Sequence, residues 1–217
     1  MKLKVCGLKY NPLEVASLRP DYIGFVFWEG SARHMTEPLP KGLPVPPHRV
    51  GVFVDAAPFY ILEKCREYGL ALVQLHGSET PAYCRELKEQ MLQASHTPPR
   101  LIKAFAVGDG FDFGPLQTYL PWVDFFLFDS RGPLPGGNGT GFDWRQLERY
   151  PFDKPYFLSG GISEGDRERL TAFCQSPAAR HCHALDVNSR FELEPGRKDI
   201  LRLKRFMEAG LRPGFPS

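Results

Sequence analysis

The chain has 217 residues, of which 42% are hydrophobic and 24% are charged, and its formal net charge is +2. This composition is ordinary for a soluble globular protein, and the length suits a single domain, residues 1–217, with a substantial core. The nearly neutral charge argues against a nucleic-acid or membrane partner bound by bulk electrostatics, although it allows a local basic pocket for a small anion. Because no apolar run has the length of a signal peptide or a membrane span, we expect a cytoplasmic protein.

Short apolar runs recur along the chain at intervals of roughly 20–30 residues, the length of one βα unit. They occupy residues 3–8, 22–27, 49–54, 72–76, 101–107, 125–129, 156–159 and 183–188. Stretches of helical periodicity lie between them at 57–66, 80–88, 163–173 and 199–206. Pro81 suits the first turn of its helix, and Gly69 suits the end of the preceding one. The prolines of residues 37–47 forbid a regular helix there.

Alternation of strands and helices predicts a parallel sheet. Eight such repeats favour closure into a single (β/α)8 barrel, the TIM-barrel architecture, because closure removes the exposed edges of the sheet. The proline-rich segment predicts that the second helix of this barrel is short or irregular. The pattern leaves one alternative open, which is an open doubly wound sheet.

Polar residues interrupt the predicted strands at positions that share one face. By the two-residue alternation of a strand, Lys4 aligns with Cys6, Gln74 with His76, Asp129 with Phe125 and Leu127, and Asp186 with Asn188, while Lys103 interrupts the fifth strand. In barrel enzymes, catalytic groups lie at the carboxyl ends of the strands. We expect these polar side chains to face the barrel interior and to surround a ligand, because so many polar groups would be costly to bury as packing alone.

Three of these residues have two interpretations each. Cys6 is either a small buried hydrophobe or a thiolate base at the barrel mouth, its pKa lowered by positive charge or backbone donors. Asp129 is either a cap at a strand end or a general acid in an apolar collar that favours its protonated form. His76 either makes a structural hydrogen bond or orients a substrate. The five cysteines are scattered without a CxxC spacing, which predicts free thiols rather than disulfides or a zinc site.

A phosphate site is predicted after the seventh strand. Gly160 and Gly161 stand between that strand and a helix, where backbone N–H groups and the helix dipole favour an anion. Barrel enzymes often hold phosphate in the loops after strands seven and eight, and residues 186–189 supply the second loop. The glycine-rich residues 132–141 form either a lid over the site or an ordinary surface loop.

Taken together, these segments resemble the phosphoribosylanthranilate isomerases over nearly the whole chain and in the same order. The resemblance is carried by Lys4-Val5-Cys6-Gly7, Ser31-Ala32-Arg33, Gln74-Leu75-His76-Gly77, Phe128-Asp129, Ser159-Gly160-Gly161 and Asp186-Val187-Asn188-Ser189. No single motif among them is decisive, but their joint order is highly specific.

The resemblance implies an Amadori rearrangement in tryptophan biosynthesis, from N-(5-phosphoribosyl)anthranilate to 1-(2-carboxyphenylamino)-1-deoxyribulose 5-phosphate. It implies Cys6 as general base and Asp129 as general acid, with no metal and no organic cofactor. Arg33 would meet the anthranilate carboxylate, and His76 would contact the substrate. The phosphate would be held by Gly160, Gly161, Asn188 and Ser189. The implied protein is a monomer or a homodimer.

Three other functions are compatible with a phosphate-binding barrel, and the residues argue against each. An aminoimidazole-ribonucleotide isomerase of histidine synthesis has related chemistry but uses an aspartate base on the first strand, so Cys6 argues against it. A pentose-phosphate epimerase would need a metal-binding set of histidines and aspartates, which these strand ends do not supply. A catalytically silent barrel that only binds a phosphorylated metabolite or a partner is disfavoured because both Cys6 and Asp129 are present.

Overall fold

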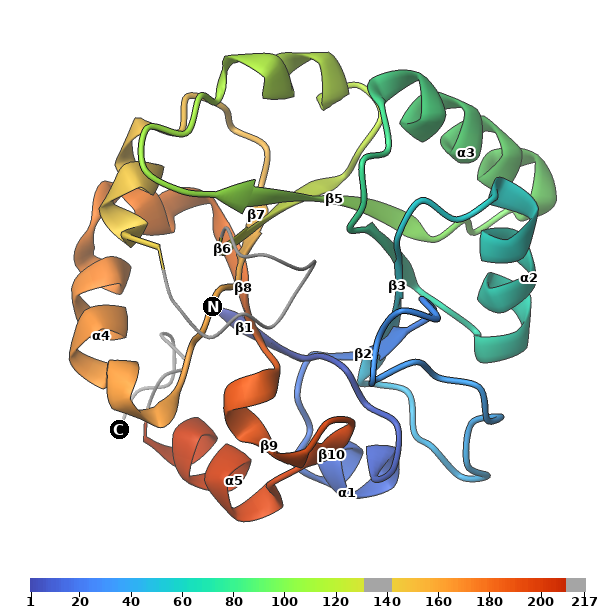
Figure 1. Cartoon of the computed structure of the whole chain (residues 1–217), viewed down its shortest axis with the longest axis horizontal. Helices are drawn as coiled ribbons and strands as arrows, with labels where there is room; N and C mark the ends of the chain where they lie inside the picture. The colour runs from blue at the N-terminus through green and yellow to red at the C-terminus, as the bar shows by residue number, and fades with distance from the viewer. Residues whose placement is uncertain (131–141, 210–217) are drawn as a thin grey trace.

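The computed structural model describes residues 1–130 and 142–209, in which eight parallel strands close into a barrel (Figure 1). The strands follow the chain order around the ring, and β1 pairs with both β2 and β8. They are β1 Lys2–Val5, β2 Tyr22–Val26, β3 His48–Phe53, β4 Leu72–Leu75, β5 Arg100–Val107, β6 Phe125–Ser130, β7 Tyr156–Leu158 and β8 Cys182–Val187. The predicted barrel is confirmed, and the open doubly wound alternative is wrong.

Helices form a ring outside the strands (Figure 1). The α-helices are α1 Pro12–Ser17, α2 Pro58–Tyr68, α3 Pro81–Ala94, α4 Arg167–Gln175 and α5 Ile200–Glu208. Short 3₁₀ helices are η1 Gly114–Tyr119, η2 Trp144–Arg149, η3 Glu164–Asp166, η4 Pro177–His181 and η5 Ser189–Phe191, and a hairpin of β9 Glu192–Glu194 and β10 Arg197–Lys198 follows η5. Helix α2 ends at Gly69, which has φ of 58° as a left-handed cap. The glycine-rich residues 132–141, where we expected a lid or a surface loop, lie outside the described residues.

The connection between β2 and β3 contains no helix, as its prolines predicted. The first part of this connection is held against the sheet by an isolated bridge between Val26 and His34. The Met35 N–H also donates to the Val26 carbonyl at 2.8 Å. Arg33 directly precedes His34 in sequence, so these contacts place it at the mouth of the barrel, where it lines the pocket.

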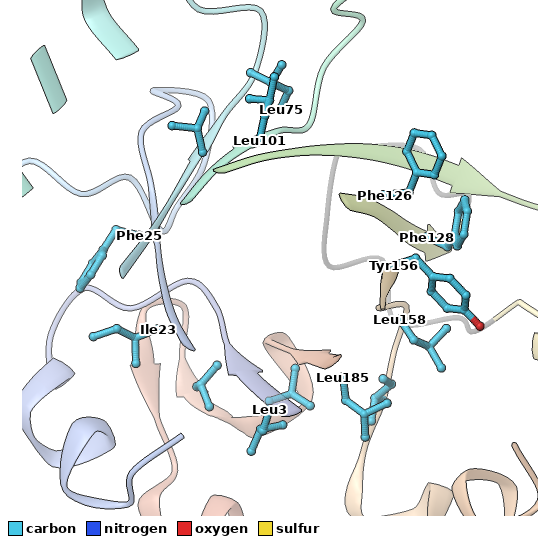
Figure 2. Close-up of a cluster of buried hydrophobic side chains, with 14 of the residues drawn as sticks. Leu3, Ile23, Phe25, Leu75, Leu101, Phe126, Phe128, Tyr156, Leu158 and Leu185 are labelled. Atoms are coloured by element: carbon cyan, nitrogen blue, oxygen red, sulfur yellow. The ribbon is translucent and has the colours of Figure 1, made fainter. Parts of the chain in front are cut away.

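Two apolar layers stabilise the barrel, one on each side of the strands. The outer layer packs strand side chains against the helices, and Figure 2 shows part of it, including Leu3, Phe25, Phe126 and Leu185. The inner layer fills the base of the barrel with Tyr22, Val50, Leu72, Ile102, Ala104, Phe125, Leu127, Phe157 and Ala184. Because this plug is apolar and buried, the polar interior is confined to the layer above it.

The structure corrects one expectation about the interior. Lys103 does not join the inner polar groups, because β5 places Ile102 and Ala104 inside and turns Lys103 to the outer face. Its Nζ donates to Glu79 Oε2 at 3.0 Å and to the Gly77 carbonyl at 2.8 Å. Lys103 therefore secures the loop that follows β4 rather than lining the site.

The five cysteines all lie in the described part of the chain and carry free thiols, as their spacing predicted. No helix within residues 1–130 and 142–209 has the length and apolar character needed to cross a membrane.

Replacing Thr80 with alanine should lower the free energy of unfolding by about 1 kcal/mol. The Thr80 hydroxyl caps helix α3 by accepting the Tyr83 N–H at 3.2 Å, and the substitution leaves that donor without its partner. Urea denaturation measures the effect. Thr171→Ala is the matched control, because the Thr171 hydroxyl donates to the Arg167 carbonyl within α4 and caps no N–H. An equal loss in both variants would contradict the capping role.

Candidate active site

A pocket of about 790 Å³, which includes space open to solvent, lies at the carboxyl ends of the strands. Its lining includes Cys6, Val26, Trp28, Ser31, Arg33, Val52, Val54, Gln74, His76, Asp129, Ser130, Ser159, Gly160, Gly161, Ile162, Asp186, Asn188, Ser189 and Arg190. All eight residues selected from the sequence as candidate site residues are in this set. The fold therefore gathers into one cavity residues from seven of its eight strands or the loops after them.

Lys4 is the buried centre of the polar layer beneath this pocket. Its Nζ donates to Gln74 Oε1 at 2.5 Å, to Asp186 Oδ2 at 2.8 Å and to Cys6 Sγ at 3.4 Å. Burial alone would lower the pKa of Lys4, but the Asp186 carboxylate and Cys6 outweigh it and raise that pKa overall. A lysine so placed remains an ammonium ion and ties three strands together. The alternation of residues in the strand predicts that Lys4 faces the barrel interior, but it does not predict these contacts.

Cys6 lies directly after β1, buried, with its thiol toward the pocket. The neighbouring strand leaves space for it at Gly24, where an added Cβ would stand 2.7 Å from Cys6 Sγ. Burial raises the pKa of the Cys6 thiol, and the nearby Lys4 ammonium only partly offsets that effect. The positive charge that the thiolate interpretation requires is present, but the pKa of Cys6 is raised rather than lowered, because desolvation is the larger effect.

Asp129 lies near the end of β6 and shares the pocket with Cys6. Its Oδ1 accepts the Ser130 N–H at 2.8 Å, and its Oδ2 is 3.5 Å from His76 Nε2. The other ring nitrogen of His76, Nδ1, is 2.8 Å from Gln74 Nε2. The acid candidate is thus connected through His76 to the polar layer of Lys4.

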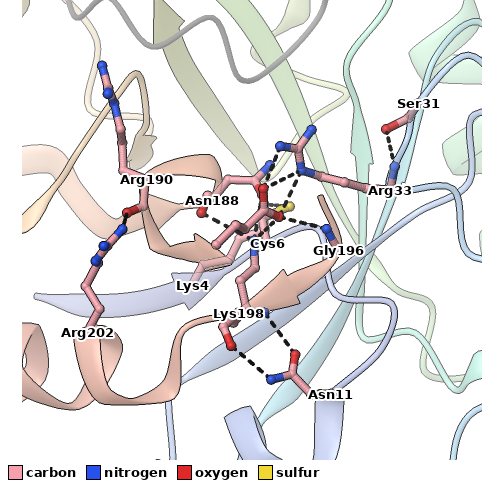
Figure 3. A network of polar contacts seen from close by, with 11 residues as sticks. Lys4, Cys6, Asn11, Ser31, Arg33, Asn188, Arg190, Gly196, Lys198 and Arg202 are labelled. Atoms are coloured by element: carbon pink, nitrogen blue, oxygen red, sulfur yellow. Dashed lines mark hydrogen bonds and ion pairs between the residues drawn. The ribbon is translucent and has the colours of Figure 1, made fainter. Parts of the chain in front are cut away.

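A second charged cluster is formed by the ion pairs of Arg33 and Lys198 with Glu192. Arg33 lines the pocket, and Figure 3 shows Arg33 and Lys198 in this network. Arg33 donates to Glu192 from Nε at 2.9 Å and from Nη2 at 2.6 Å, and Lys198 Nζ donates to Glu192 Oε1 at 2.7 Å. Burial would raise the pKa of Glu192, but the two cations hold it below its ordinary value. Burial lowers the pKa of Lys198, against the opposing effect of Glu192.

This cluster changes the interpretation of two predicted residues. Arg33 lines the pocket, but two of its nitrogens already donate hydrogen bonds to Glu192. Asn188 also lines the pocket, but its Oδ1 accepts from Lys198 Nζ at 2.8 Å. Glu192 and Lys198 were missed as site residues because they belong to the hairpin after β8, where barrel periodicity gives no signal.

The loop after β7 adopts a backbone conformation that requires glycine at two positions. Gly160 and Gly161 have φ of 97° and 73°, in the region that side chains disfavour. A Cβ at Gly160 would also collide with the side chain of Ser130. Within the described part of the chain, neither glycine N–H has a hydrogen-bond partner. The loop thus offers two backbone donors beside the pocket, followed by the capping box of Ser163 and Asp166.

The fold and this pocket define a barrel enzyme whose strand ends carry groups suited to acid–base chemistry on a small anion. Within the described residues, no group of three or more His, Cys, Asp or Glu side chains is arranged to hold a metal ion. The family model for N-(5'-phosphoribosyl)anthranilate (PRA) isomerase matches residues 3–209. The chain therefore belongs to the N-(5'-phosphoribosyl)anthranilate isomerase family.

Individual relatives agree with this assignment. The N-(5'-phosphoribosyl)anthranilate isomerase of Parabacteroides distasonis is 38% identical over 220 residues, covering 98% of this chain and 95% of that protein. The phosphoribosyl anthranilate isomerase structure from Thermotoga maritima matches with a TM-score of 0.76 and 30% identity, covering 96% of this chain and 97% of the other. An isomerase structure in complex with reduced 1-(o-carboxyphenylamino)-1-deoxyribulose 5-phosphate matches with a TM-score of 0.73 and 28% identity, over 96% and 97% of the two chains.

Proposed function

We propose that this chain isomerises N-(5'-phosphoribosyl)anthranilate to 1-(2-carboxyphenylamino)-1-deoxyribulose 5-phosphate, with Cys6 as general base and Asp129 as general acid. The observation that carries the residue roles is the single pocket that holds both side chains together with the glycine loop. The substrate follows from the family match and from the related structure that binds the reduced product analogue.

The reaction requires one proton to be given and another to be taken. Asp129 donates a proton to the furanose ring oxygen while the bond from that oxygen to C1 breaks, and the anthranilate nitrogen supplies the electron pair that forms the C1 Schiff base. Cys6 as thiolate then removes the proton at C2, and the electrons of that C–H bond form an enolamine. Tautomerisation of the enolamine gives the ketone. The carbon–oxygen bond that breaks and the double bonds that form lie within the substrate, and no electrons or groups leave it, so general acid and base groups suffice.

Substrate binding divides between two sides of the pocket. The Arg33, Glu192 and Lys198 cluster contains two cations and one anion, which suits the carboxylate of the anthranilate ring. The free N–H groups of Gly160 and Gly161, with Ser189 from the loop after β8, suit the phosphate. Because Asn188 Oδ1 is bound to Lys198, its side-chain N–H₂ is the group that remains for the substrate.

The remaining expectations form part of the same proposal. Residues 1–217 act as one barrel domain, and the partner is this phosphorylated small molecule rather than a nucleic acid or a membrane. The protein works in the cytoplasm as a monomer or a homodimer. One related structure from Thermotoga maritima is described as monomers generated from a dimeric isomerase, so both states occur among relatives.

Replacing Gly161 with aspartate should raise KM about tenfold relative to Gly161→Asn, because a carboxylate would face the substrate phosphate. Asparagine has the same shape and tolerates the left-handed backbone of this position, where φ is 73°, so the pair isolates the charge. Steady-state kinetics at constant ionic strength measures the difference. Equal KM values in the two variants would place the phosphate elsewhere.

The function itself is tested with enzymatically generated phosphoribosylanthranilate. Wild-type protein should abolish the fluorescence of the anthranilate substrate in a first-order process whose rate is proportional to enzyme concentration. The related aminoimidazole ribonucleotide of histidine synthesis is the comparison substrate. Turnover of that compound alone would contradict the proposal, and turnover of neither would return the silent barrel as the better explanation.

A further inference from the structure

A chain of polar contacts crosses the barrel from Lys4 to Asp129. Lys4 Nζ lies 2.5 Å from Gln74 Oε1, Gln74 Nε2 lies 2.8 Å from His76 Nδ1, and His76 Nε2 lies 3.5 Å from Asp129 Oδ2. Gln74 is 1% exposed and takes no part in the chemical steps described above. This buried amide lies between a cation and a histidine, so its orientation determines which ring nitrogen of His76 can carry a proton.

The direction of these contacts follows from the donors available. A lysine ammonium has three protons and no acceptor, so each group that contacts Lys4 must accept. Lys4 contacts Cys6 Sγ, Asp186 Oδ2 and the Gln74 amide, and the Gln74 atom that faces it is therefore the oxygen. The amide N–H₂ then faces His76 as a donor. Nδ1 of a neutral His76 must accept, so its proton resides on Nε2, toward Asp129.

We propose that Gln74, oriented by Lys4, is a positioning residue that fixes His76 as the Nε2–H tautomer facing Asp129. The inference rests on the proposed function, in which Asp129 is the general acid. After Asp129 has given its proton to the ring oxygen, its carboxylate accepts from His76 at Oδ2 and from the Ser130 N–H at Oδ1. Two donors aimed at the developing negative charge stabilise the product of the acid step. The opposite tautomer would turn a lone pair toward that charge.

Strand β5, which lies between His76 and Asp129, has small side chains where the two residues approach each other. β5 stands between β4, which precedes His76, and β6, which carries Asp129. Beyond Ile102, its inward positions are Ala104, a member of the inner apolar layer, and Ala106, which pairs in register with Asp129. Because both side chains are only methyl groups, the His76 ring can extend across β5 to the carboxylate.

The tautomer can be measured without turnover. Two-bond ¹H–¹⁵N NMR spectra of uniformly ¹⁵N-labelled, unliganded wild-type protein report the protonation of each ring nitrogen, and His76→Asn assigns the His76 signals by their loss. We expect a protonated Nε2 and an unprotonated Nδ1. In Gln74→Glu, a carboxylate replaces the N–H₂ donor, so Nδ1 should become protonated. A wild-type Nδ1–H signal, or unchanged signals in Gln74→Glu, would overturn the inference.

The kinetic arm uses Gln74→Met, which keeps the length of the side chain and removes both polar atoms. It should lower kcat about tenfold, part of the contribution of a general acid, with KM changed less than about twofold. Gln117→Met, at an exposed position of helix η1, is the matched control. Wild-type kcat in Gln74→Met would overturn the positioning role. Full activity in Asp129→Asn would instead overturn the acid assignment, while the NMR result would still report the tautomer.

Discussion

Asp129→Asn and Cys6→Ser are each expected to lower kcat/KM by about 10²–10⁴-fold, the usual contribution of a general acid or base. Asparagine keeps the shape of Asp129 and can still accept the Ser130 N–H, which in the wild type donates at 2.8 Å, but it has no proton to give to the ring oxygen. A serine hydroxyl at position 6 is far less acidic than a thiol, so the fraction present as the basic anion collapses. Fluorescence-monitored turnover measures both losses.

Two controls separate lost chemistry from lost structure. Asp153→Asn alters an aspartate whose side chain is 97% exposed, and Cys174→Ser alters a cysteine outside the pocket lining, so both should keep wild-type activity. Thermal unfolding of all four variants establishes that each is folded at the assay temperature. Activity above half of the wild-type value in either folded active-site variant is incompatible with the role given to that residue.

Lys4→Met should have the second large effect, on both stability and the pH dependence of the rate. The substitution leaves the buried Asp186 carboxylate without the cation that lies 2.8 Å away, and breaking a buried pair in this manner costs about 3–5 kcal/mol. It also removes the positive charge that lowers the pKa of Cys6 against the effect of burial, so that pKa rises further. Since the thiolate is the active form, the rising limb of the rate against pH moves to higher pH.

Asp186→Asn is the opposing test. The Asp186 carboxylate raises the pKa of Cys6, so its neutralisation should move the same limb to lower pH. Lys2→Met, the same substitution at an exposed position of the same strand, should leave both stability and the pH profile unchanged. Movement of the limb in one direction for both Lys4→Met and Asp186→Asn would show that the thiol does not govern it.

Much of the barrel and its inner polar layer could be predicted because strand alternation is a strong and local signal. Lys4 and Cys6 were placed on one face from their spacing, and Gln74 with His76 likewise, and both pairs lie inside. The absence of a helix at 37–47 followed from proline, which has no N–H to donate. In each case the structure follows from the residue types of a few neighbouring positions in the sequence.

The remainder depends on contacts between distant segments, which no local pattern encodes. The expectation that Lys103 faces the barrel interior is wrong because the alternation of β5 starts from Ile102, whose side chain fills the barrel base. The Glu192 partnership of Arg33 joins residues 159 positions apart in the sequence. The pKa of Cys6 is a sum of burial and opposing charges, and the sign of such a sum requires the packed structure.

The pairing of β1 with β8 has a consequence for the order of events during protein synthesis. Lys4 and its counter-ion Asp186 are 182 positions apart, so the ribosome produces the cation long before the anion. A nascent chain that has folded its early strands still lacks strand β8, which closes the barrel, and the Asp186 carboxylate that affects the pKa of Cys6. Catalytic competence therefore arrives late and all at once, when the final strand seals the ring against the first.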